Sequence, residues 1–491
     1  MDREAAKLLD RLRGDFIGLD TTYVRADGRQ TRRVYLDSTA STLMMRAAHD
    51  AVEAYYRHYA NTHSLLHYSA RISTTQYRWA HDRILSFLGA DPERYTCVFM
   101  GSGATACINR MARVFRDTAG DRDVAMVSMM EHHSNDLPHR KHAGEVVHIP
   151  LEQHVGHPGC VDMEALAELL EEHGPRVKYV AVTGVSNVTG IVNPVHDIAE
   201  IAHRYGALLL VDGAQMAAHM PVRICDPDHP ERNIDAFVFS GHKTYVPGSP
   251  GVLICRKDLL ACIEPEEVGG GMVESVLVQT YTVSDRFPER EEAGTPNIPG
   301  AIGLAAAVEV LARIGMPEIL EDETALLLLA LKGLKAIDDL VIYGCPSMVR
   351  CPRVGSISFN LRGLPHGLTA AILNDHYNIA VRNECFCAHP YVKEMILEDL
   401  IDAADDFDDD DLEREITLRS GMVRASLGLY STREDVELLV QAMVEIAARQ
   451  EELAALYQAD ECGEYRLKAP ETVPSPNRFS VTDFLTSYLE G

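Results

Sequence analysis

Residues 178–213 read KYVAVTGVSNVTGIVNPVHDIAEIAHRYGALLLVDG, and this stretch decides the fold. Its first six residues, KYVAVT, form a short run of β-rich composition that is typical of a strand. Asn193 and Pro194 supply a helix cap and a first-turn proline, apolar residues then recur at helical spacing, and Gly206 stands where a helix-ending glycine belongs. Residues 207–211 (ALLLV) read as a second, fully buried strand. Together they predict a right-handed βαβ unit in a parallel sheet that is covered on both faces.

The rest of the chain extends this unit into an α/β protein with two domains. Residues 236–239 and 251–255 predict two more strands of the sheet, and residues 303–314 predict a long helix that leads into a smaller α+β domain. The small domain should contain strands at 354–361 and 378–381 and a helix at 433–451. The predicted organisation is an N-terminal arm (1–30) that packs with the small domain, a large domain (31–300), a small domain (301–451) and a C-terminal extension (452–491) that is either a docking tail or a loosely ordered terminus.

The composition excludes several classes of protein. The chain has 491 residues, of which 46% are hydrophobic and 24% charged, so it can bury large cores and is not a disordered or fibrous protein. Its 46 basic and 73 acidic residues give a net charge of -27, which excludes nucleic acid and acidic membranes as partners. No apolar run is long enough to span a bilayer, and the N-terminus lacks a signal-peptide pattern, so we expect a cytoplasmic protein. The 11 cysteines have scattered spacings and no CxxC pair, so we expect reduced thiols and no metal site.

Polar residues follow each predicted strand of the sheet, where ligands of open parallel sheets bind. Asp212 follows one strand, Lys243 lies four residues beyond the end of another, and Asn187 follows the first. Pyridoxal phosphate requires a lysine that forms a Schiff base with its aldehyde and a carboxylate that pairs with its pyridine nitrogen. The order and spacing of these residues therefore predict a site for this cofactor.

The same residues lie in motifs that resemble the class V aminotransferase group of fold type I enzymes, and within it the cysteine desulfurase and selenocysteine lyase family. The resemblance runs from residue 35 to about residue 440, in the order of the family. It implies a large domain with a mainly parallel central sheet and a smaller α+β domain. The motifs are Tyr35-Leu36-Asp37-Ser38, Ser102-Gly103-Ala104-Thr105, Glu131-His132-His133, Val185-Ser186-Asn187, Val211-Asp212-Gly213-Ala214-Gln215, Phe239-Ser240-Gly241-His242-Lys243, Ala293-Gly294-Thr295-Pro296-Asn297 and Arg424-Ala425-Ser426-Leu427.

The resemblance implies a role for each residue around the cofactor ring. Lys243 would form the Schiff base and Asp212 would pair with the pyridine nitrogen. His132 would stack on the ring and move protons beside it. Asn187 and Gln215 would hydrogen-bond the 3-oxygen of the ring.

The resemblance also implies how the phosphate is held. Ala104 and Thr105 would bind it at a helix N-terminus, where free backbone N–H groups and the helix dipole favour an anion. Ser240 and His242 would assist them. In this family Thr295 reaches the phosphate from the other subunit, so a homodimer is implied.

The loop Arg382-Asn383-Glu384-Cys385-Phe386-Cys387-Ala388-His389-Pro390 narrows the reaction. It resembles the desulfurase loop in which an arginine is followed five residues later by Cys-Ala-x-Pro. That alignment selects Cys387 as the catalytic cysteine, while Cys385 is interpreted as a buried small side chain or a bystander.

The implied activity is that of a cysteine desulfurase, which converts L-cysteine to L-alanine and leaves the sulfur as a persulfide on the enzyme. Arg424 would pair with the substrate carboxylate, with Arg382 and Asn187 as further substrate contacts. Lys243 would remove the α-proton, and the Cys387 thiolate would attack the substrate sulfur.

Five positions depart from the family pattern. Ser64 and Leu65 stand where relatives usually have Arg-Gly, Ala106 replaces a glutamate, Gly184 replaces a histidine and Glu384 replaces a glycine. A carboxylate at position 384 disfavours a nearby thiolate by like-charge repulsion.

These departures keep other hypotheses open. A selenocysteine lyase would use the same machinery. A C–S lyase, epimerase or aminotransferase acting on a modified amino acid would keep the cofactor and not use Cys387. A non-catalytic scaffold is a third hypothesis, against which the retention of Lys243 and Asp212 argues.

Residues 394–415 form an acidic segment with 12 acidic residues and one basic residue, so it supplies 11 of the 27 negative charges. It lies between the Cys387 loop and Arg424. One interpretation is a solvated insertion or an adaptation to high salt. The other is a docking surface for a basic sulfur-acceptor protein.

Overall fold

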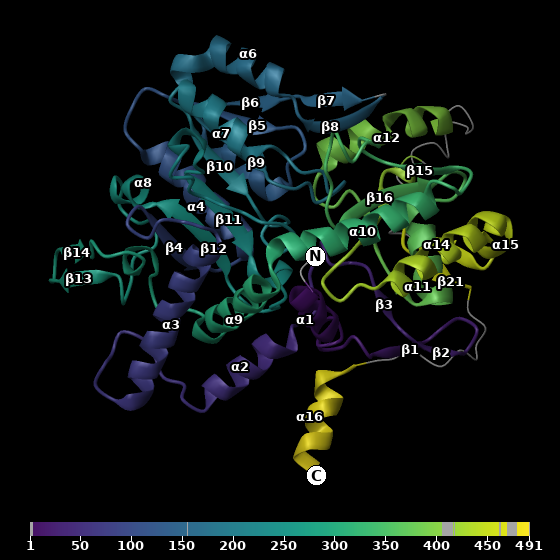
Figure 1. Cartoon of the computed structure of the whole chain (residues 1–491), viewed down its shortest axis with the longest axis horizontal. Helices are drawn as coiled ribbons and strands as arrows, with labels where there is room; N and C mark the ends of the chain where they lie inside the picture. Colours follow the sequence, from purple (N-terminus) through teal and green to yellow (C-terminus); the bar gives the residue numbers. More distant parts are fainter. Residues whose placement is uncertain are drawn as a thin grey trace.

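A seven-stranded sheet forms the centre of the large domain in the computed structural model, which describes residues 3–154, 156–404, 416, 418–460, 463–468 and 479–490 (Figure 1). Its order is β4-β12-β11-β10-β9-β5-β6. Neighbouring strands from β11 to β6 are parallel, whereas β12 is antiparallel to both of its neighbours. This confirms the predicted α/β class. The strands are β4 (Tyr95–Met100), β5 (Val124–Ser128), β6 (Glu145–Ile149), β9 (Val177–Thr183), β10 (Leu208–Asp212), β11 (Ala236–Ser240) and β12 (Gly251–Arg256).

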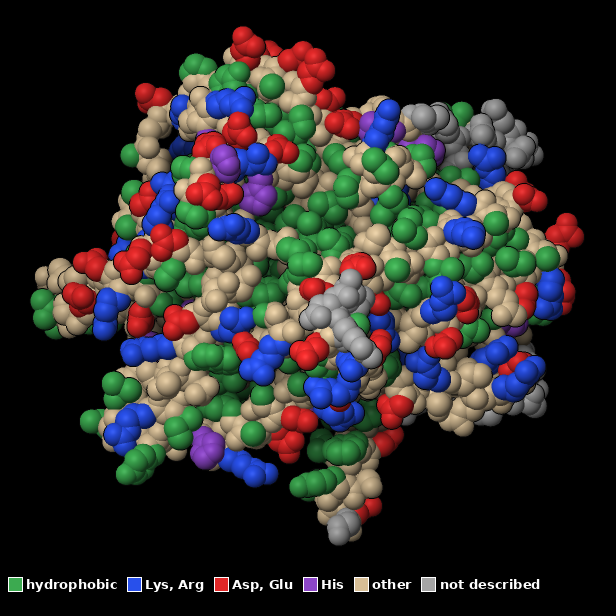
Figure 2. Space-filling view, in the orientation of Figure 1, with side chains coloured by type: hydrophobic (Ala, Val, Ile, Leu, Met, Phe, Trp, Pro, Cys, Tyr) green, Lys and Arg blue, Asp and Glu red, His purple; other side chains and the backbone are tan. Residues whose placement is uncertain are grey.

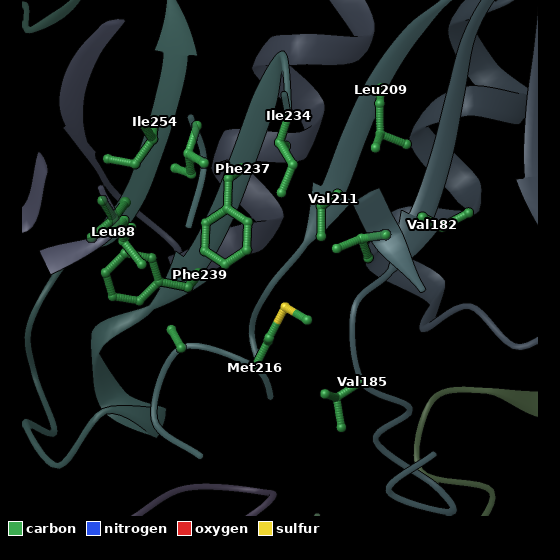
Figure 3. Close-up of a cluster of buried hydrophobic side chains, with 14 of the residues drawn as sticks. Leu88, Val182, Val185, Leu209, Val211, Met216, Ile234, Phe237, Phe239 and Ile254 are labelled. Atoms are coloured by element: carbon green, nitrogen blue, oxygen red, sulfur yellow. The ribbon is translucent and has the colours of Figure 1, made fainter. Parts of the chain in front are cut away.

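Helices cover both faces of this sheet, because successive side chains of a strand point to opposite sides. On β10, Leu209 and Val211 belong to one core cluster and Leu210 to another. Figure 3 shows the first cluster, in which Val182, Val211, Phe237 and Ile254 lie along one face. The first face packs on α3 (Tyr68–Phe87), α6 (Met163–His173), α7 (Val195–Arg204) and α9 (Ile298–Ile314), and the second on α4 (Gly103–Asp117) and α8 (Lys257–Ala261).

The βαβ unit predicted from residues 178–213 is present as β9, α7 and β10. Gly206 has a φ of +69°, as expected for a glycine that ends a helix. The predicted cap at Asn193 is wrong, because Pro194 is the N-cap residue of α7 and its side chain makes no capping bond. Asn193 instead accepts a hydrogen bond from Val161 N at 2.9 Å and donates one to Thr183 O at 2.8 Å. Its side chain therefore joins two strands rather than starting a helix.

The small domain has a four-stranded sheet of order β15-β16-β19-β18, and helices pack against this sheet in one hydrophobic core. The helix predicted over 433–451 breaks at Arg449, whose φ of -129° and ψ of 29° are not helical, so two helices stand in its place. The elements are β15 (Leu340–Ile342), β16 (Ser356–Leu361), β18 (Arg382–Glu384), β19 (Met422–Ser426), α10 (Met316–Leu334), α11 (His366–Tyr377), α12 (His389–Ala404), α14 (Arg433–Ala448) and α15 (Gln450–Ala454).

The N-terminal segment contacts both domains. Leu9 of α1 (Arg3–Arg13) is buried in a cluster with Leu311 of α9 and Tyr430. Strand β3 (Val34–Tyr35) pairs in parallel with β17 (Ile379–Ala380) of the small domain. The predicted domain boundaries stay predictions. The remaining elements before residue 300 are β1 (Thr22–Val24), β2 (Gln30–Arg32), α2 (Arg46–Tyr56), α5 (Leu137–His142), β7 (Leu151–His154), β8 (His157–Val161), β13 (Val273–Val276) and β14 (Tyr281–Val283).

The C-terminal extension holds a hairpin of β20 (Tyr457–Ala459) and β21 (Tyr465–Leu467), and then α16 (Val481–Glu490), which has no buried residue (Figure 1). Half of the acidic segment, residues 405–415, lies outside the described residues, so its docking function stays a prediction. Within the described ranges, no single helix is long and apolar enough to cross a bilayer. One pair, α9 and α10, passes that test only when taken together across a bend of 79°.

A buried carboxylate, Glu292, joins three parts of the large domain. It accepts hydrogen bonds from the Tyr77 hydroxyl at 2.7 Å, from His81 Nε2 at 2.9 Å and from the backbone N–H of Phe99 at 2.7 Å. The first two donors lie on α3 and the third on β4. Glu292 therefore holds the segment that precedes Thr295 against the sheet.

Replacing Glu292 with alanine should lower the free energy of unfolding by about 3–5 kcal/mol, because three buried donors lose their acceptor. Urea denaturation followed by circular dichroism measures the change. Glu171→Ala, on the exposed side of α6, is the matched control and should stay within about 0.5 kcal/mol of the parent protein. Equal stability of the two variants would contradict the role assigned to Glu292.

Candidate active site

The predicted site residues, with one exception, line a single cavity of about 500 Å³ at the carboxyl ends of the parallel strands. The exception is Thr295, which lies in a neighbouring cavity. The fold thus brings together side chains that are far apart in the sequence. The residues that line the cavity as predicted are Ala104, Thr105, His132, Asn187, Asp212, Gln215, Ser240, His242, Lys243, Arg382, Cys387 and Arg424.

Asp212 and Lys243 carry opposite charges into this cavity. Asp212 ends β10, and its Oδ1 accepts a hydrogen bond from Ala214 N at 2.9 Å. Burial raises the pKa of Asp212, against the opposing effects of that N–H group and of Lys243. Burial lowers the pKa of Lys243 to about 8, although Asp212 acts in the opposite direction. The lysine amine is therefore available as a nucleophile and base near neutral pH.

The N-terminus of α4 forms one end of the cavity. Gly103 begins the helix with a φ of +63°, and a Cβ there would lie 2.8 Å from Ser240 Oγ. Ala104 N donates a hydrogen bond to this Ser240 oxygen at 2.8 Å, and Thr105 Oγ1 lies 2.8 Å from Ser134 Oγ. Backbone N–H groups, three hydroxyls and the helix dipole converge here, which is a suitable environment for a phosphate.

His132 is held as a neutral imidazole. Its Nδ1 accepts a hydrogen bond from Ser134 N at 3.0 Å, which assigns the proton to Nε2. Burial, together with the charges of Lys243, His133 and Arg424, lowers the pKa of His132 to about 3. His132 therefore acts near neutral pH as an uncharged N–H donor.

Arg424 is buried beside the cavity and is held on three sides. Its Nη1 donates to Asn187 O at 2.7 Å, and its Nη2 lies 3.5 Å from Asp37 Oδ1. Its guanidinium carbon lies 4.6 Å from the centre of the Phe386 ring. Burial lowers the pKa of Arg424 to about 10, so it stays positively charged at neutral pH. Its Nε is buried without a hydrogen-bond partner, which leaves a donor for a ligand.

The loop that carries Cys387 has a left-handed backbone at three residues, since Glu384, Phe386 and Cys387 have φ values of 89°, 50° and 56°. Two hydrogen bonds hold it: Asn187 Nδ2 donates to Phe386 O at 2.8 Å, and His133 N donates to Cys387 O at 2.7 Å. The Cys387 side chain is exposed at the cavity. The positive φ of Glu384 gives a physical reason why glycine is the usual residue there.

The other cysteine of the loop has a different environment. Cys385 is buried, and its thiol contacts Ser420 O at 3.3 Å, so its position is that of a small core side chain. Among the departures from the family pattern, a side chain at Gly184 would have to displace the Met216 side chain, because a Cβ there would lie 2.7 Å from Met216 Sδ. Ser64 is not among the residues that line the cavity.

Thr295 lies in a second cavity of about 670 Å³. This cavity shares Ser102, Thr105 and Ser249 with the first, so the two meet at the N-terminus of α4. Thr295 is exposed, and its hydroxyl accepts a hydrogen bond from Asn61 Nδ2 at 3.2 Å. Within one chain it therefore lies next to the cavity without lining it.

Three contributors to the site were missed from the sequence. Phe386 packs on Arg424, Ser134 fixes the tautomer of His132, and Asp37 pairs with Arg424. Asp37 and Phe386 lie inside motifs quoted for the resemblance, so their position was a usable signal. Ser134 carries no such signal, because its role comes from a backbone N–H group.

Residues 34–439 match the family described as Aminotransferase class-V. The chain belongs to this family. A probable cysteine desulfurase of Halalkalibacterium halodurans is 34% identical over 84% of this chain and 92% of that protein. A cysteine desulfurase of Klebsiella pneumoniae is 34% identical over 89% of this chain and 98% of that protein.

Solved structures of the family agree with the architecture. A cysteine desulfurase from Thermococcus onnurineus NA1 superposes with a TM-score of 0.72 and 30% identity, over 85% of this chain and 95% of that one. The cysteine desulfurase CsdA from Escherichia coli gives a TM-score of 0.70 and 30% identity, over 90% of this chain and 98% of that one. The fold is therefore that of the pyridoxal-phosphate enzymes of fold type I.

The family depends on pyridoxal 5'-phosphate, and this chain is a pyridoxal-phosphate-dependent enzyme. The cavity fits the cofactor. Lys243 and Asp212 would hold the aldehyde and the pyridine nitrogen, and the N-terminus of α4 with Ser240 would hold the phosphate. When bound, the cofactor withdraws electrons from the α-carbon of an amino acid.

The reaction of Lys243 in the apoenzyme with pyridoxal phosphate should follow the lowered lysine pKa. Only the neutral amine reacts, so the rate should rise with a midpoint near pH 8, whereas an ordinary lysine has a midpoint near about 10.4. Asp212→Asn should move the midpoint to lower pH, because the Asp212 carboxylate raises the pKa of Lys243. Stopped-flow absorbance across a pH series measures both.

The matched control for this pH series is Asp258→Asn, whose carboxylate pairs with Arg256 outside the cavity. It should leave the midpoint unchanged. A midpoint near about 10 in the parent protein would show that burial does not govern the pKa of Lys243. An upward shift in Asp212→Asn would show that the Asp212 carboxylate does not raise that pKa.

Proposed function

We propose that this protein is a cysteine desulfurase that converts L-cysteine to L-alanine and receives the sulfur on Cys387. The observation that carries the proposal is the exposed Cys387 thiol on the same cavity as Lys243 and Arg424. A base, a cation for a carboxylate and a thiol therefore surround one space. The names of the relatives support the same activity.

Each residue has a defined part in this reaction. Arg424 binds the substrate carboxylate, and the Asn187 carbonyl and Asp37 orient its guanidinium. Lys243, as a neutral amine, removes the α-proton of the substrate. His132 donates its Nε2–H group into the cavity without bringing in a charge.

Sulfur transfer follows at Cys387. Its thiolate attacks the substrate sulfur, an S–S bond forms and the C–S bond of the substrate breaks. The electron pair of the broken bond stays on the carbon skeleton, which takes up protons to become alanine. One cysteine and one enzyme thiol thus give one alanine and one enzyme persulfide.

A second candidate is a C–S lyase, epimerase or aminotransferase that acts on a modified amino acid. Two observations favour it: Met216 fills the space beside Gly184 where relatives usually have a histidine, and Glu384 brings a carboxylate and a left-handed backbone to the cysteine loop. In this case the chemistry at Lys243 would proceed without Cys387.

Cys387→Ala should abolish sulfide and alanine formation from L-cysteine, because no thiol remains to accept the sulfur. Cys385→Ala is the matched control and should retain turnover, since Cys385 is buried away from the cavity. Alanine, sulfide and the mass of the Cys387 peptide are measured. Turnover of L-cysteine or of another amino acid that survives Cys387→Ala would support the second candidate instead.

We also propose that two chains form a homodimer in which Thr295 serves the cofactor site of the other chain. Thr295 is exposed beside the cavity that adjoins the N-terminus of α4. The β13–β14 hairpin nearby carries apolar side chains that one chain leaves exposed, namely Val276, Leu277 and Val278. Figure 2 shows hydrophobic side chains at the left tip of the molecule, where this hairpin lies. A partner chain would cover this surface.

The double variant Leu277→Glu, Val278→Glu should convert the dimer into a monomer of 54.3 kDa, because two charges would be buried in an apolar interface. Light scattering after size exclusion measures the mass. Val444→Glu, an exposed apolar position on α14, is the control and should leave the mass unchanged. A parent protein that is already monomeric would refute the dimer.

Two further features of this function stay predictions: a basic acceptor protein that docks on the acidic segment, and a cytoplasmic location. The exposure of Cys387 supports the first, because a persulfide there would be accessible to a second protein.

A further inference from the structure

A cluster of metal-binding side chains lies between the two domains. His154 ends β7, and Cys345 and Cys351 lie in the segment between β15 and β16. One ring nitrogen of His154 and the two Sγ atoms all lie within 4.8 Å of one another. The sequence predicts no metal site, because the chain has no CxxC pair and its cysteines have scattered spacings. The fold instead assembles the three ligands from segments that are far apart in the chain.

A fourth thiol, that of Cys160, lies beside these three side chains but outside the set of atoms that are all within 4.8 Å of one another. Cys160 on β8 is buried and packs in one small cluster with Cys345 and Cys351. Its thiol contacts Val192 O at 3.4 Å, a weak interaction that loss of the thiol proton would remove. Glu152 also lies nearby, and its Oε2 pairs with His154 Nε2 at 2.8 Å, but its side chain is partly exposed and structural zinc sites prefer thiolate ligands. We therefore assign the fourth position to Cys160.

The absence of a side chain at Gly159 allows His154 and Cys351 to lie close together. A Cβ at this position would lie 2.8 Å from His154 Cδ2 and 3.0 Å from Cys351 Sγ. Cβ atoms in proteins essentially never come closer than 3.0 Å to another heavy atom. The first distance is below that limit and the second is at it, so any side chain would push the two ligands apart. A glycine at the point where the ligands converge permits their approach.

The backbone around the cluster is fixed by hydrogen bonds between the domains. Cys345 N donates to Pro158 O at 2.9 Å, and Val192 N donates to Pro352 O at 2.9 Å. Ile191 and Arg353 form an isolated bridge between the same segments. The ligands are therefore positioned by a defined framework and not by free loops.

A buried cation offsets the charge that such a site would carry. Three thiolates, a neutral imidazole and a divalent ion have a net charge of about -1. Arg353 is buried, and its Nη2 donates to Cys345 O at 2.7 Å and to Tyr343 O at 3.0 Å. Its Nη1 is buried without a hydrogen-bond partner, and in the described part of the chain Arg353 makes no ion pair with a carboxylate. An unpaired buried cation beside the thiols is the partner that an anionic metal centre needs.

We propose that His154, Cys160, Cys345 and Cys351 bind one structural Zn²⁺ that fastens the β7–β8 hairpin of the large domain to the small domain. Zinc takes four ligands in tetrahedral geometry and prefers thiolate and imidazole, and a site with four protein ligands leaves no position for substrate. The site is separate from the cofactor cavity, since none of the four residues lines that cavity.

The first experiment measures zinc in the purified holoenzyme, produced without a histidine tag, by mass spectrometry of the metal. About one zinc per chain is expected. Cys345→Ser and Cys351→Ser should lose it while retaining the absorbance of bound pyridoxal phosphate. Cys262→Ser, an exposed cysteine outside the cluster, is the matched control and should keep full zinc. Absence of zinc from the parent protein, or full zinc in both cluster variants, would overturn the proposal.

Three measurements on the parent protein test the zinc site without any variant. A chelator applied to the parent holoenzyme should remove the zinc and lower its melting temperature, and added Zn²⁺ should restore it. Cobalt substitution should give thiolate-to-cobalt and tetrahedral d–d absorption. Peptide mapping without reductant should find Cys345 and Cys351 as free thiols, and a disulfide between them in a metal-free protein would overturn the site.

The fourth ligand is tested by Cys160→Ser and Glu152→Gln. Cys160→Ser should weaken zinc binding strongly and reduce the intensity of the cobalt charge-transfer band, since one thiolate is lost. Glu152→Gln should keep the zinc. The reverse result would overturn the assignment of Cys160.

Discussion

Two buried charges of opposite sign, Asp212 and Lys243, share one cavity, and the rest of the structure depends on keeping them there. Burial raises the pKa of Asp212 and lowers the pKa of Lys243, so in each case it favours the neutral form of the side chain. Neighbouring strands deliver the two residues to the same edge, since β10 and β11 are parallel and paired. Helices on both faces then exclude water, so that these charges interact with a ligand in a medium of low polarity.

The parts of this arrangement that follow from local patterns could be predicted from the sequence. A buried strand that ends at Asp212 and a strand that ends before Lys243 both stand out by composition. Because parallel strands bring their carboxyl ends together, the residue types at those ends indicated the cofactor without any contact being known. The resemblance then added His132, Arg424 and Cys387, which no periodicity selects.

The parts that could not be predicted depend on tertiary contacts. Asparagine is a residue type that often caps helices, but the amide of Asn193 instead joins two strands, because Val161 N and Thr183 O lie within hydrogen-bond distance. The break at Arg449 lies in a continuous helical pattern. The sequence predicts reduced thiols at Cys345 and Cys351, and spacing alone does not show that His154 lies beside them, because sequence spacing identifies a cluster only when its members are close in the chain. A hairpin of the other domain brings His154 to the two cysteines.

The left-handed backbone of the Cys387 loop has an unfavourable local conformation that contacts from outside the loop hold in place. A residue with a side chain costs about 1 kcal/mol or more in this conformation, and three such residues stand within four positions. Two hydrogen bonds, from Asn187 and His133, oppose that cost. The position of the Cys387 thiol is thus set by contacts from the large domain and not by the local preference of its own backbone. A change at Asn187 or His133 would therefore alter the geometry of a residue about 200 positions or more away in the chain.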